Sequence, residues 1–332
     1  MAPLPTVAVI IPAYNTAPFL RRAVESVWAT EYPNLQVVII DDGSWDETVA
    51  IARRLCAEAP SRCHLLQHPA GLHRGVSATR NLGLDYTDSE WVAFLDSDDT
   101  YLPHRFACLE QGAPDPPLVE AMYGLTRMHF DGAPPSVTNP WWSGTGDDLF
   151  GIRDPLQGAA LLERLLTGVC WATSAITLRR SLVARTGGFD PRKQIAEDCD
   201  LWFRVAAIGR VVPGDLSQPI SRYHRHDSNN YEYRIEHRVP MVLAMLDAWR
   251  WARQAGAPAE RLDVFRDAVP HYAERAVIAA REAGRPDVAW ALLRIMARRA
   301  PLSFFIALGP WRQIRGLFCG SGRQSSADEV SP

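Results

Sequence analysis

Three carboxylates lie within four positions at the end of an apolar segment, in the sequence Asp96-Ser97-Asp98-Asp99. The preceding run, Trp91 to Leu95, is continuously apolar and predicts a strand that is buried on both faces. Carboxylates this close repel one another unless solvent, hydrogen-bond donors or a cation offset the repulsion. Magnesium and manganese prefer such oxygen ligands and often also bind substrate phosphates. The sequence therefore predicts a divalent metal site here, with a solvated acidic turn that caps the next helix as the alternative.

The elements that must position these acids alternate along the first third of the chain. Strands are predicted at Val7–Ile11, Val37–Ile40, Leu65-Leu66 and Trp91–Leu95. Three helices are predicted between and after them: one that Pro18 opens, one that runs through Leu55, and one over Gly75–Leu84. Ser44 and Glu47 have the spacing of a capping box for the second of these helices. Such alternation predicts a parallel sheet, and ligands bind beyond the carboxyl ends of its strands. Asp42, Asp96 and Asp98 should therefore lie at one edge.

Composition narrows the class of protein. The 332 residues are 47% hydrophobic and carry a formal net charge of -3, so a large core is expected and nucleic acid is not an expected partner. The six cysteines include no Cys-x-x-Cys pair, which fits a reduced setting. Neither a signal-peptide pattern nor an apolar run of about 20 residues is present, so we expect a cytoplasmic protein. Glycine-rich dinucleotide and Walker motifs are also missing, which leaves the phosphates of a substrate to be held by metal.

Four segments, in this order and spacing, resemble the signature of the inverting family-2 glycosyltransferases. They are Val9-Ile10-Ile11-Pro12-Ala13-Tyr14-Asn15, Asp41-Asp42-Gly43-Ser44, Ala78-Thr79-Arg80-Asn81-Leu82-Gly83 and Phe94-Leu95-Asp96-Ser97-Asp98-Asp99. The resemblance implies an α/β protein of the GT-A fold, whose Rossmann-like sheet has helices on both faces. It also implies a nucleotide-sugar donor and a divalent metal, Mn or Mg.

The same resemblance implies roles for single residues. The implied donor contacts are Pro12, Tyr14, Asp42, Arg80 and Asp96, of which Tyr14 and Asp42 match nucleobase contacts and Asp96 a ribose or donor contact. The implied metal ligand is Asp98. Two alternatives remain open. Tyr14 and Asn15 can form a turn that caps the first helix, and Arg80 can pair with a neighbouring acid instead of approaching the diphosphate.

The middle of the chain predicts an acceptor-binding half. Residues Gly112–Asp154 are rich in Pro, Gly and Asp and contain one predicted strand at Met122–Phe130. Trp141-Trp142, in the same stretch, can contact sugar rings or anchor the loop to the core. A helix around Leu161–Leu166 and a strand over Thr173–Arg180 should follow.

A second segment carries the resemblance further. Gly187-Gly188-Phe189-Asp190 and Glu197-Asp198 resemble the acceptor segment of the same family, in which the Asp of Glu-Asp serves as the base. The implied catalytic base is Asp198, and the implied acceptor contacts are Gly188, Phe189, Glu197 and Trp202. For Glu197 the alternative is structural, because a helix that starts there favours negative charge in its first turn.

The segment Ser221–Asn229 resembles the family's terminal Tyr-Arg-x-His motif, with His224 where Arg is usual. Arg225 is therefore expected to contact the donor diphosphate, and His226 to bind the metal or the diphosphate. This departure leaves the division of roles among His224, Arg225 and His226 open.

The remaining residues have helical spacing and a cluster of arginines. From Glu236 onward, apolar residues punctuated by Pro270 and Pro301 predict a small helical appendage. Its cluster comprises Arg285, Arg294, Arg298, Arg299, Arg312, Arg315 and Arg323, close to Phe304, Phe305 and Trp311. Such a surface either lies on an anionic membrane or is simply solvated. We thus expect a nucleotide-sugar-binding half at 1–111, an acceptor-binding half at 112–230 and a helical appendage at 231–332.

These inferences converge on a metal-dependent inverting glycosyltransferase. It would move a sugar from a nucleotide-sugar donor, UDP-linked by family frequency, to a hydroxyl of a glycan or lipid-linked glycan in cell-surface polysaccharide synthesis. One alternative is a sugar-phosphate nucleotidyltransferase, whose glycine-rich basic loop after the first strand is replaced here by Pro12-Ala13-Tyr14-Asn15. The other is a non-catalytic glycan-binding relative, which should have lost the carboxylates that this chain retains.

Overall fold

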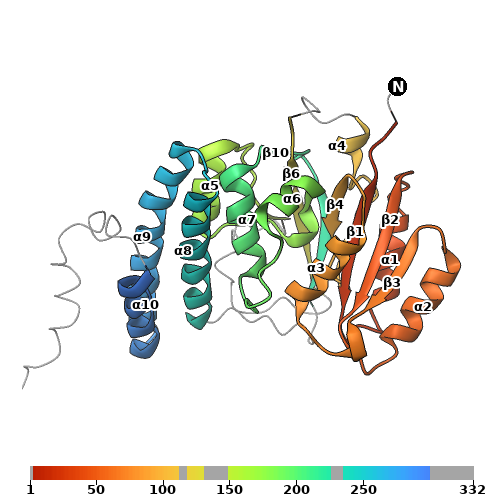
Figure 1. Cartoon of the computed structure of the whole chain (residues 1–332), viewed down its shortest axis with the longest axis horizontal. Helices are drawn as coiled ribbons and strands as arrows, with labels where there is room; N and C mark the ends of the chain where they lie inside the picture. Colours follow the sequence, from red (N-terminus) through yellow and green to blue (C-terminus); the bar gives the residue numbers. More distant parts are fainter. Residues whose placement is uncertain (1–2, 112–117, 131–148, 226–234, 300–332) are drawn as a thin grey trace, which may run out of the picture.

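A seven-stranded sheet forms the centre of the molecule, which is described here from a computed structural model covering residues 3–111, 118–130, 149–225 and 235–299 (Figure 1). In spatial order its strands are β10 (Val211–Pro213), β6 (Ala121–Tyr123), β9 (Ile176–Arg179), β4 (Trp91–Phe94), β1 (Val7–Ala13), β2 (Leu35–Asp41) and β3 (Cys63–Gln67). The strands from β3 to β4 are parallel, as predicted, whereas β9 runs antiparallel to both β4 and β6.

The two faces of this sheet are covered by different helices, because successive residues of a strand point to opposite sides. Val7, Val9 and Ile11 pack in one hydrophobic cluster with residues of α1 (Leu20–Trp28) and α2 (Thr48–Glu58). Ile10 belongs to the other cluster, on the side of α3 (Val76–Tyr86). There, a Cβ on Gly83 would come within 2.8 Å of Ile10, so this glycine lets α3 lie directly against the sheet.

A second, four-stranded sheet stands beside the first. It has the order β5 (Thr100–Tyr101), β11 (Pro219–Arg225), β7 (Leu125–Phe130) and β8 (Leu149–Phe150). The single strand predicted over Met122–Phe130 is in fact two strands, β6 and β7, which belong to different sheets. The break falls at Gly124, where a Cβ would lie 2.4 Å from the side chain of Ile220.

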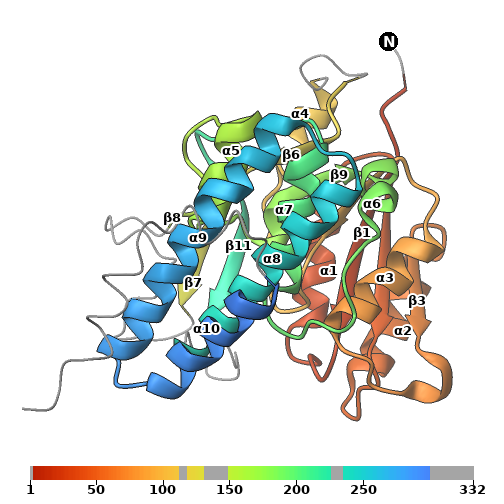
Figure 2. The ribbon, with the colours of Figure 1, turned by 60° about the vertical axis from the view of Figure 1, so that its left-hand side comes forward.

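The other helices follow the second half of the chain. They are α4 (Ala107–Glu110), α5 (Gly158–Leu166), α6 (Arg180–Thr186), α7 (Glu197–Ile208), α8 (Arg238–Gln254), α9 (Ala259–Glu282) and α10 (Pro286–Arg299), with short 3-10 turns at Pro69–Gly71, Thr173–Ala175 and Ile235–His237. Figures 1 and 2 show α8, α9 and α10 side by side, away from α2 and β3. Pro270 does not interrupt this part, because it lies inside α9. Pro301 falls outside the described residues.

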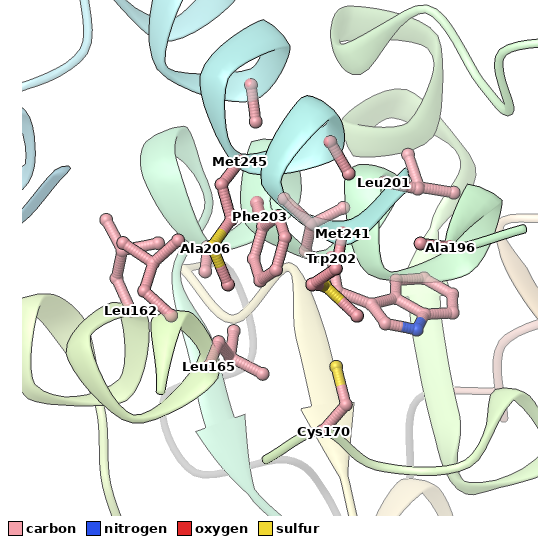
Figure 3. Close-up of a cluster of buried hydrophobic side chains, with 14 of the residues drawn as sticks. Leu162, Leu165, Cys170, Ala196, Leu201, Trp202, Phe203, Ala206, Met241 and Met245 are labelled. Atoms are coloured by element: carbon pink, nitrogen blue, oxygen red, sulfur yellow. The ribbon is translucent and has the colours of Figure 1, made fainter. Parts of the chain in front are cut away.

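The C-terminal helices pack directly on α7. Figure 3 shows Met241 and Met245 of α8 facing Trp202 and Phe203 of α7. All four side chains belong to the same hydrophobic cluster as Ile10 of the central sheet. One core therefore joins the N-terminal sheet to the C-terminal helices. In the part of the chain that the structure describes, no helix is both long enough and apolar enough to cross a membrane.

The capping box predicted at Ser44 and Glu47 is wrong. The second helix begins at Thr48, and its N-cap residue Glu47 makes no side-chain capping bond. Ser44 Oγ instead accepts a hydrogen bond from the backbone N–H of Asn15, at 3.0 Å. The Asn15 side chain accepts the backbone N–H of Trp45 and does not cap the first helix, which starts at Leu20 without a side-chain cap. These contacts tie together the two loops that follow β1 and β2.

Candidate active site

A cavity of about 390 Å³ lies where the loop after β4 meets the start of α7. Its polar wall includes Arg80, Asp96, Asp99, Glu197, Asp198 and Tyr223. Its apolar wall includes Met128, Phe150, Trp171 and Met241, so the second sheet and the C-terminal helix α8 both contribute to it. A smaller cavity, of about 30 Å³, is lined by Arg105, Phe106 and Tyr123 and holds none of the predicted site residues.

Asp96, Asp98 and Asp99, termed here the donor-side acids, follow the carboxyl end of β4. Asp96 and Asp98 are partly exposed, whereas Asp99 is buried. The loop that carries them is fixed at two points. Arg22 of α1 donates a hydrogen bond to the backbone oxygen of Asp98 at 3.0 Å, and Asp99 Oδ1 accepts the backbone N–H of His224 in β11 at 3.0 Å.

The neighbouring acids disfavour the charged form of Asp99. Burial, followed by the charges of Asp98 and Asp96, raises the pKa of Asp99 well above its ordinary value. The hydrogen bond from His224 and the charge of Arg22 oppose this shift without cancelling it. A cation placed near these carboxylates would therefore stabilise the charged loop.

Asp42 is enclosed by the loop that precedes α3. Its side chain is buried, and its two oxygens accept the backbone N–H groups of Arg74 at 2.7 Å and Gly75 at 2.9 Å. His73 Nδ1 lies 2.9 Å from the same carboxylate and stacks on Tyr14, with ring centroids 4.3 Å apart. Tyr14 is 44% exposed. Of the two residues predicted to contact the nucleobase, Tyr14 is thus accessible and Asp42 holds the loop beside it.

Arg80 lies at the junction of the predicted donor and acceptor sides. Its side chain is buried, and its Nη2 donates to Asp96 Oδ1 at 2.7 Å while Nη1 donates to Glu197 Oε1 at 3.1 Å. The guanidinium also lies 5.2 Å from the centre of the Phe189 ring. Although burial opposes it, the pKa of Arg80 is raised by Asp96 and Glu197. The structure thus shows the paired arrangement that the sequence left open for Arg80.

Glu197, Asp198 and Asp200, termed here the helix acids, form the first turn of α7. Glu197 pairs with Arg80, and Asp200 pairs with Arg204 at 2.7 Å, one helical turn along. No basic side chain in the described ranges forms an ion pair with Asp198. Its Oδ2 accepts a long hydrogen bond of 3.5 Å from the Thr173 hydroxyl. Its Oδ1 accepts the backbone N–H of Cys199 at 2.7 Å. Asp198 is therefore the helix acid that has no arginine partner among the described residues.

Burial affects the other two helix acids strongly. It raises the pKa of Glu197 to about 7, with a further contribution from the charge of Asp198 and an opposing one from Arg80. Burial likewise raises the pKa of Asp200, against the pull of Arg204 and Lys193. Both buried carboxylates are thus held in place by arginine partners, Glu197 by Arg80 and Asp200 by Arg204.

Three of the predicted acceptor contacts do not line the cavity, and their contact with an acceptor stays a prediction. Trp202 is fully buried in the cluster of Figure 3, and Phe189 is 1% exposed beneath Arg80. Gly188 has a φ of 70°, a region that favours glycine, and its oxygen accepts a hydrogen bond from Arg204. These residues support α7 instead, whereas Glu197 does line the cavity.

The other predicted residues have varied positions. Pro12 is buried within β1, opposite Ile40, so the strand does not end before it as predicted. Arg225 ends β11 and lines the cavity, whereas His224 is buried with its Nε2 3.1 Å from the Thr100 hydroxyl. His226, Trp141 and Trp142 lie outside the described residues.

The donor-side acids offer the oxygen ligands that a divalent ion prefers, but their side chains do not already surround a metal site. Within the described ranges, no group of three or more His, Cys, Asp or Glu side chains is placed to hold a metal. Magnesium and manganese, however, commonly take only one or two protein carboxylates and complete their shell with water and substrate phosphates. Asp98, partly exposed beside a buried acid whose pKa is raised by its neighbours, meets that requirement.

Sequence reasoning missed the apolar wall of the cavity. Trp171 and Cys170 precede β9, and Met241 comes from α8, which the sequence placed in an appendage. The signal for Met241 was only helical spacing, which predicts a buried face and not its neighbour. His73 was missed because a lone histidine in a loop carries no pattern.

Comparison with known families gives a match over the N-terminal part. Residues 8–119 match the family model described as glycosyl transferase family 2. An uncharacterized glycosyltransferase of Nostoc sp. is 27% identical over 234 residues, which cover 68% of this chain and 66% of that protein. The succinoglycan biosynthesis protein ExoO of Rhizobium meliloti is 37% identical over 102 residues, 31% of this chain and 28% of that one. The matched regions thus span two thirds or less of these relatives.

Solved structures share the fold over most of the chain. Residues 1–349 of TarS from S. aureus superpose with a TM-score of 0.53 at 15% identity, covering 88% of this chain and 91% of that one. A mannosyltransferase of Pyrobaculum calidifontis, solved with GDP-Man and Mn2+, gives a TM-score of 0.53 at 19% identity, covering 96% and 89%. At this identity the likeness shows a shared fold and no more.

Proposed function

Since the chain is a family-2 glycosyltransferase of the GT-A fold, we propose that it transfers a sugar from a nucleotide-sugar donor to an acceptor hydroxyl with inversion. One observation carries the proposal. A single cavity is lined both by Asp96, at the carboxyl end of the parallel strands, and by Asp198, on α7. Parallel sheets bind nucleotides at that edge, and an inverting transfer needs a base on the other side of the sugar.

The reaction would proceed in one displacement. Asp198 accepts the proton of the acceptor hydroxyl, whose oxygen attacks the anomeric carbon while the bond to the diphosphate breaks. Thr173 holds the Asp198 carboxylate through its hydroxyl. Arg225, at the end of β11 and on the cavity wall, offers positive charge for the diphosphate. The base and the leaving group thereby lie on opposite sides of the sugar.

The donor is proposed to bind across the ends of β1, β2 and β4. Tyr14, exposed and stacked on His73, would contact the nucleobase, and Asp96 the ribose. A Mn or Mg ion held by Asp98 would stabilise the charge that develops on the departing nucleoside diphosphate. A UDP-linked sugar is the first candidate, because TarS has been solved with UDP and with UDP-GlcNAc. The mannosyltransferase with GDP-Man makes a guanine nucleotide the second.

The acceptor is proposed to be a glycan or a lipid-linked glycan used in cell-surface polysaccharide synthesis. A Campylobacter jejuni relative, 29% identical over 110 residues, is a glucosyltransferase acting on an undecaprenol-linked glycan. The apolar wall of the cavity suits such a molecule. In this arrangement residues 1–111 would bind the donor and residues 112–230 the acceptor, and the helices between 235 and 299 would support α7.

A thermal-shift screen tests the donor proposal. Melting is measured with UDP, GDP and ADP, each with and without MnCl₂, and then with UDP-glucose, UDP-N-acetylglucosamine and GDP-mannose. A ligand that binds only the folded protein should stabilise it by about 2.7 kcal/mol at a hundred times its dissociation constant. Release of UDP or GDP from the stabilising sugar, with an octyl glycoside as acceptor probe, should follow. Formation of a nucleotide sugar from a sugar phosphate would instead indicate a nucleotidyltransferase, and binding of the octyl glycoside alone a glycan-binding protein.

Contact with an anionic membrane surface is proposed for α10. Arg294 and Arg298 are exposed on this helix, near Trp290, which is 51% exposed. Arg285 and Arg299, by contrast, pair with Asp287 and Asp247. Binding to phosphatidylserine vesicles should exceed binding to phosphatidylcholine vesicles and decline with salt. Equal binding to both vesicle types would show that the arginines are only solvated.

A further inference from the structure

Arg80 joins three segments that are far apart in the sequence. It reaches from α3 to Asp96 after β4, to Glu197 at the start of α7, and over the ring of Phe189 in the turn before α7. Its side chain is buried, and both ion pairs are within hydrogen-bonding distance. A buried ion pair of this kind fixes geometry, because either partner left alone would be an uncompensated charge.

The backbone just before Glu197 needs such fixing. Ala196 is buried and has a φ of 59°, in the left-handed region that costs an alanine about 1 kcal/mol or more. The preceding residues are held from two sides. Ser77 of α3 donates to the Lys193 oxygen at 3.2 Å, and Lys193 Nζ donates to Asp247 of α8 at 2.8 Å. The start of α7 is therefore imposed by its surroundings and not by local preference.

Consecutive residues on a helix point about 100° apart, so the direction of Glu197 sets the direction of Asp198. Glu197 is directed to Arg80, and its side chain is 14% exposed. Asp198 is then directed to the Thr173 hydroxyl and the cavity. A rotation of this first turn would move both carboxylates together.

We propose that Glu197 is a positioning residue that acts on the reaction through Arg80, holding Asp198 in place, and that it does not contact the acceptor. The inference rests on the proposed function, in which Asp198 is the base. It has a consequence for the donor side, since the guanidinium that holds Glu197 also holds Asp96. Placement of the base and of the proposed ribose contact then depends on the same side chain.

The test separates an effect on turnover from an effect on acceptor binding. UDP release is measured for the wild type, Glu197→Ala, Glu197→Gln and Asp198→Asn, with the nucleotide sugar found in the thermal-shift screen and an octyl glycoside as acceptor probe. A displacement of the base by about 1 Å can cost on the order of a hundredfold in rate, so Glu197→Ala should lower kcat by roughly ten- to a hundredfold. The acceptor KM should stay within about threefold, because uniform binding is not changed.

A conservative replacement and a double-mutant cycle test whether Glu197 acts through Arg80. Glu197→Gln keeps an oxygen that can accept from Arg80, so it should recover most of the kcat that Glu197→Ala loses. In an Arg80→Gln background, Glu197→Ala should have little further effect, because the two residues act as one unit. Glu58→Gln, which removes an exposed carboxylate from its pair with Arg21, is the matched control and should keep wild-type turnover.

Several outcomes would overturn the inference. They are a kcat of wild-type size in Glu197→Ala, an acceptor KM that rises tenfold or more at constant kcat, or full additivity with Arg80→Gln. If Arg80→Gln does not fold, the split between kcat and KM in the two Glu197 variants still decides. Wild-type turnover of Asp198→Asn would instead contradict the proposed function. Loss of turnover in Asp198→Asn with none in Glu197→Ala would contradict this inference alone.

Discussion

The donor-side acids and the helix acids are two groups of three carboxylates on the wall of one cavity or next to it, but their charges are balanced in different ways. Glu197 and Asp200 each pair with a buried arginine, Arg80 or Arg204. On the donor side, Asp96 shares Arg80 with Glu197, and the pKa of Asp99 is raised by burial and by the two neighbouring acids. Two of the three helix acids are thus paired with arginines of the chain, whereas the donor-side acids would gain from a cation supplied with the substrate.

This difference distinguishes acids that hold the structure together from acids that can take part in the reaction. A carboxylate that is paired with a buried arginine is fixed in position, and that partner occupies its oxygens. Asp198 is the helix acid that has no arginine partner among the described residues, and its carboxylate accepts the backbone N–H of Cys199 and a long hydrogen bond from Thr173. Asp98 is a partly exposed donor-side acid. The comparison therefore supports the proposals that Asp198 is the base and Asp98 the metal ligand, and a single substitution tests each proposal.

The largest effect is expected for Asp98→Asn. The change keeps the size of the side chain and removes the charge proposed to hold the metal, which supplies several kcal/mol of transition-state stabilisation. Turnover should drop by roughly a thousandfold, equivalent to about 4 kcal/mol. The manganese-dependent part of the thermal shift with UDP should disappear. Full turnover of the variant, or wild-type turnover in EDTA, would remove the distinction between the two groups of acids.

Arg204→Met should have the next largest effect, on stability. It leaves Asp200 buried without its main partner and also removes bonds to the oxygens of Thr186 and Gly188. Breaking a buried pair in this way typically costs about 3 kcal/mol or more. The double variant Asp200→Asn with Arg204→Met should melt higher than Arg204→Met alone, because the unpaired charge is gone. Equal melting temperatures would show that Asp200 does not depend on Arg204.

Asp198→Asn should reduce turnover by on the order of a hundredfold, the usual cost of losing a positioned base. The affinity for UDP with manganese, measured by calorimetry, should be unchanged, because the proposed nucleotide contacts lie at the strand ends. Asp200→Asn is the control in the same helical turn and should keep most of the turnover if folded. A variant Asp198→Asn with normal turnover would refute the assignment of the base.

The N-terminal part of the fold could be predicted well from the sequence, and the reason is local. The runs Val7–Ile11 and Val37–Ile40 are apolar throughout, a pattern typical of parallel strands that are buried on both faces, and the structure confirms both. The position of the acids after these strands is fixed by the ends of the strands. The edge of the sheet that carries Asp42 and Asp96 could therefore be predicted as well. In the acceptor half, the helix predicted around Leu161–Leu166 and the strand predicted over Thr173–Arg180 correspond to α5 and β9. The loops between such elements carry no comparable periodicity.

Contacts between distant segments account for what sequence reasoning missed. The split of β6 from β7 depends on Ile220, almost a hundred residues later in the chain, which leaves no space for a side chain at Gly124. Trp202 was predicted to contact the acceptor, but packing of α8 buries it completely. The pairing of Arg80 with Glu197 joins residues 117 positions apart. Local motifs cannot show which charged residues meet across such separations.

The smallest expected effect concerns the pH dependence of stability and comes from Glu197. Its pKa is about 7 in the folded protein, raised from 4.5 first by burial and then by Asp198. The folded state therefore binds a proton more tightly than the unfolded state between these values. The resulting stabilisation is fully present below about pH 4.5 and is lost as the pH rises to about 7. Asp99 and Asp200 shift in the same direction, so only a comparison with a variant isolates Glu197.

Glu197→Gln removes this titration. Relative to the variant, the wild type should lose on the order of 2 kcal/mol of stability between pH 5 and pH 8, seen as a difference in melting temperature that changes with pH. Glu58→Gln should not reproduce this change, because Arg21 lowers the pKa of that exposed carboxylate and gives the opposite sign. If the two melting curves stay parallel across this range, Arg80 compensates Glu197 completely. The charge of Glu197 would then be fully balanced by Arg80, which would sharpen the contrast with the donor-side acids.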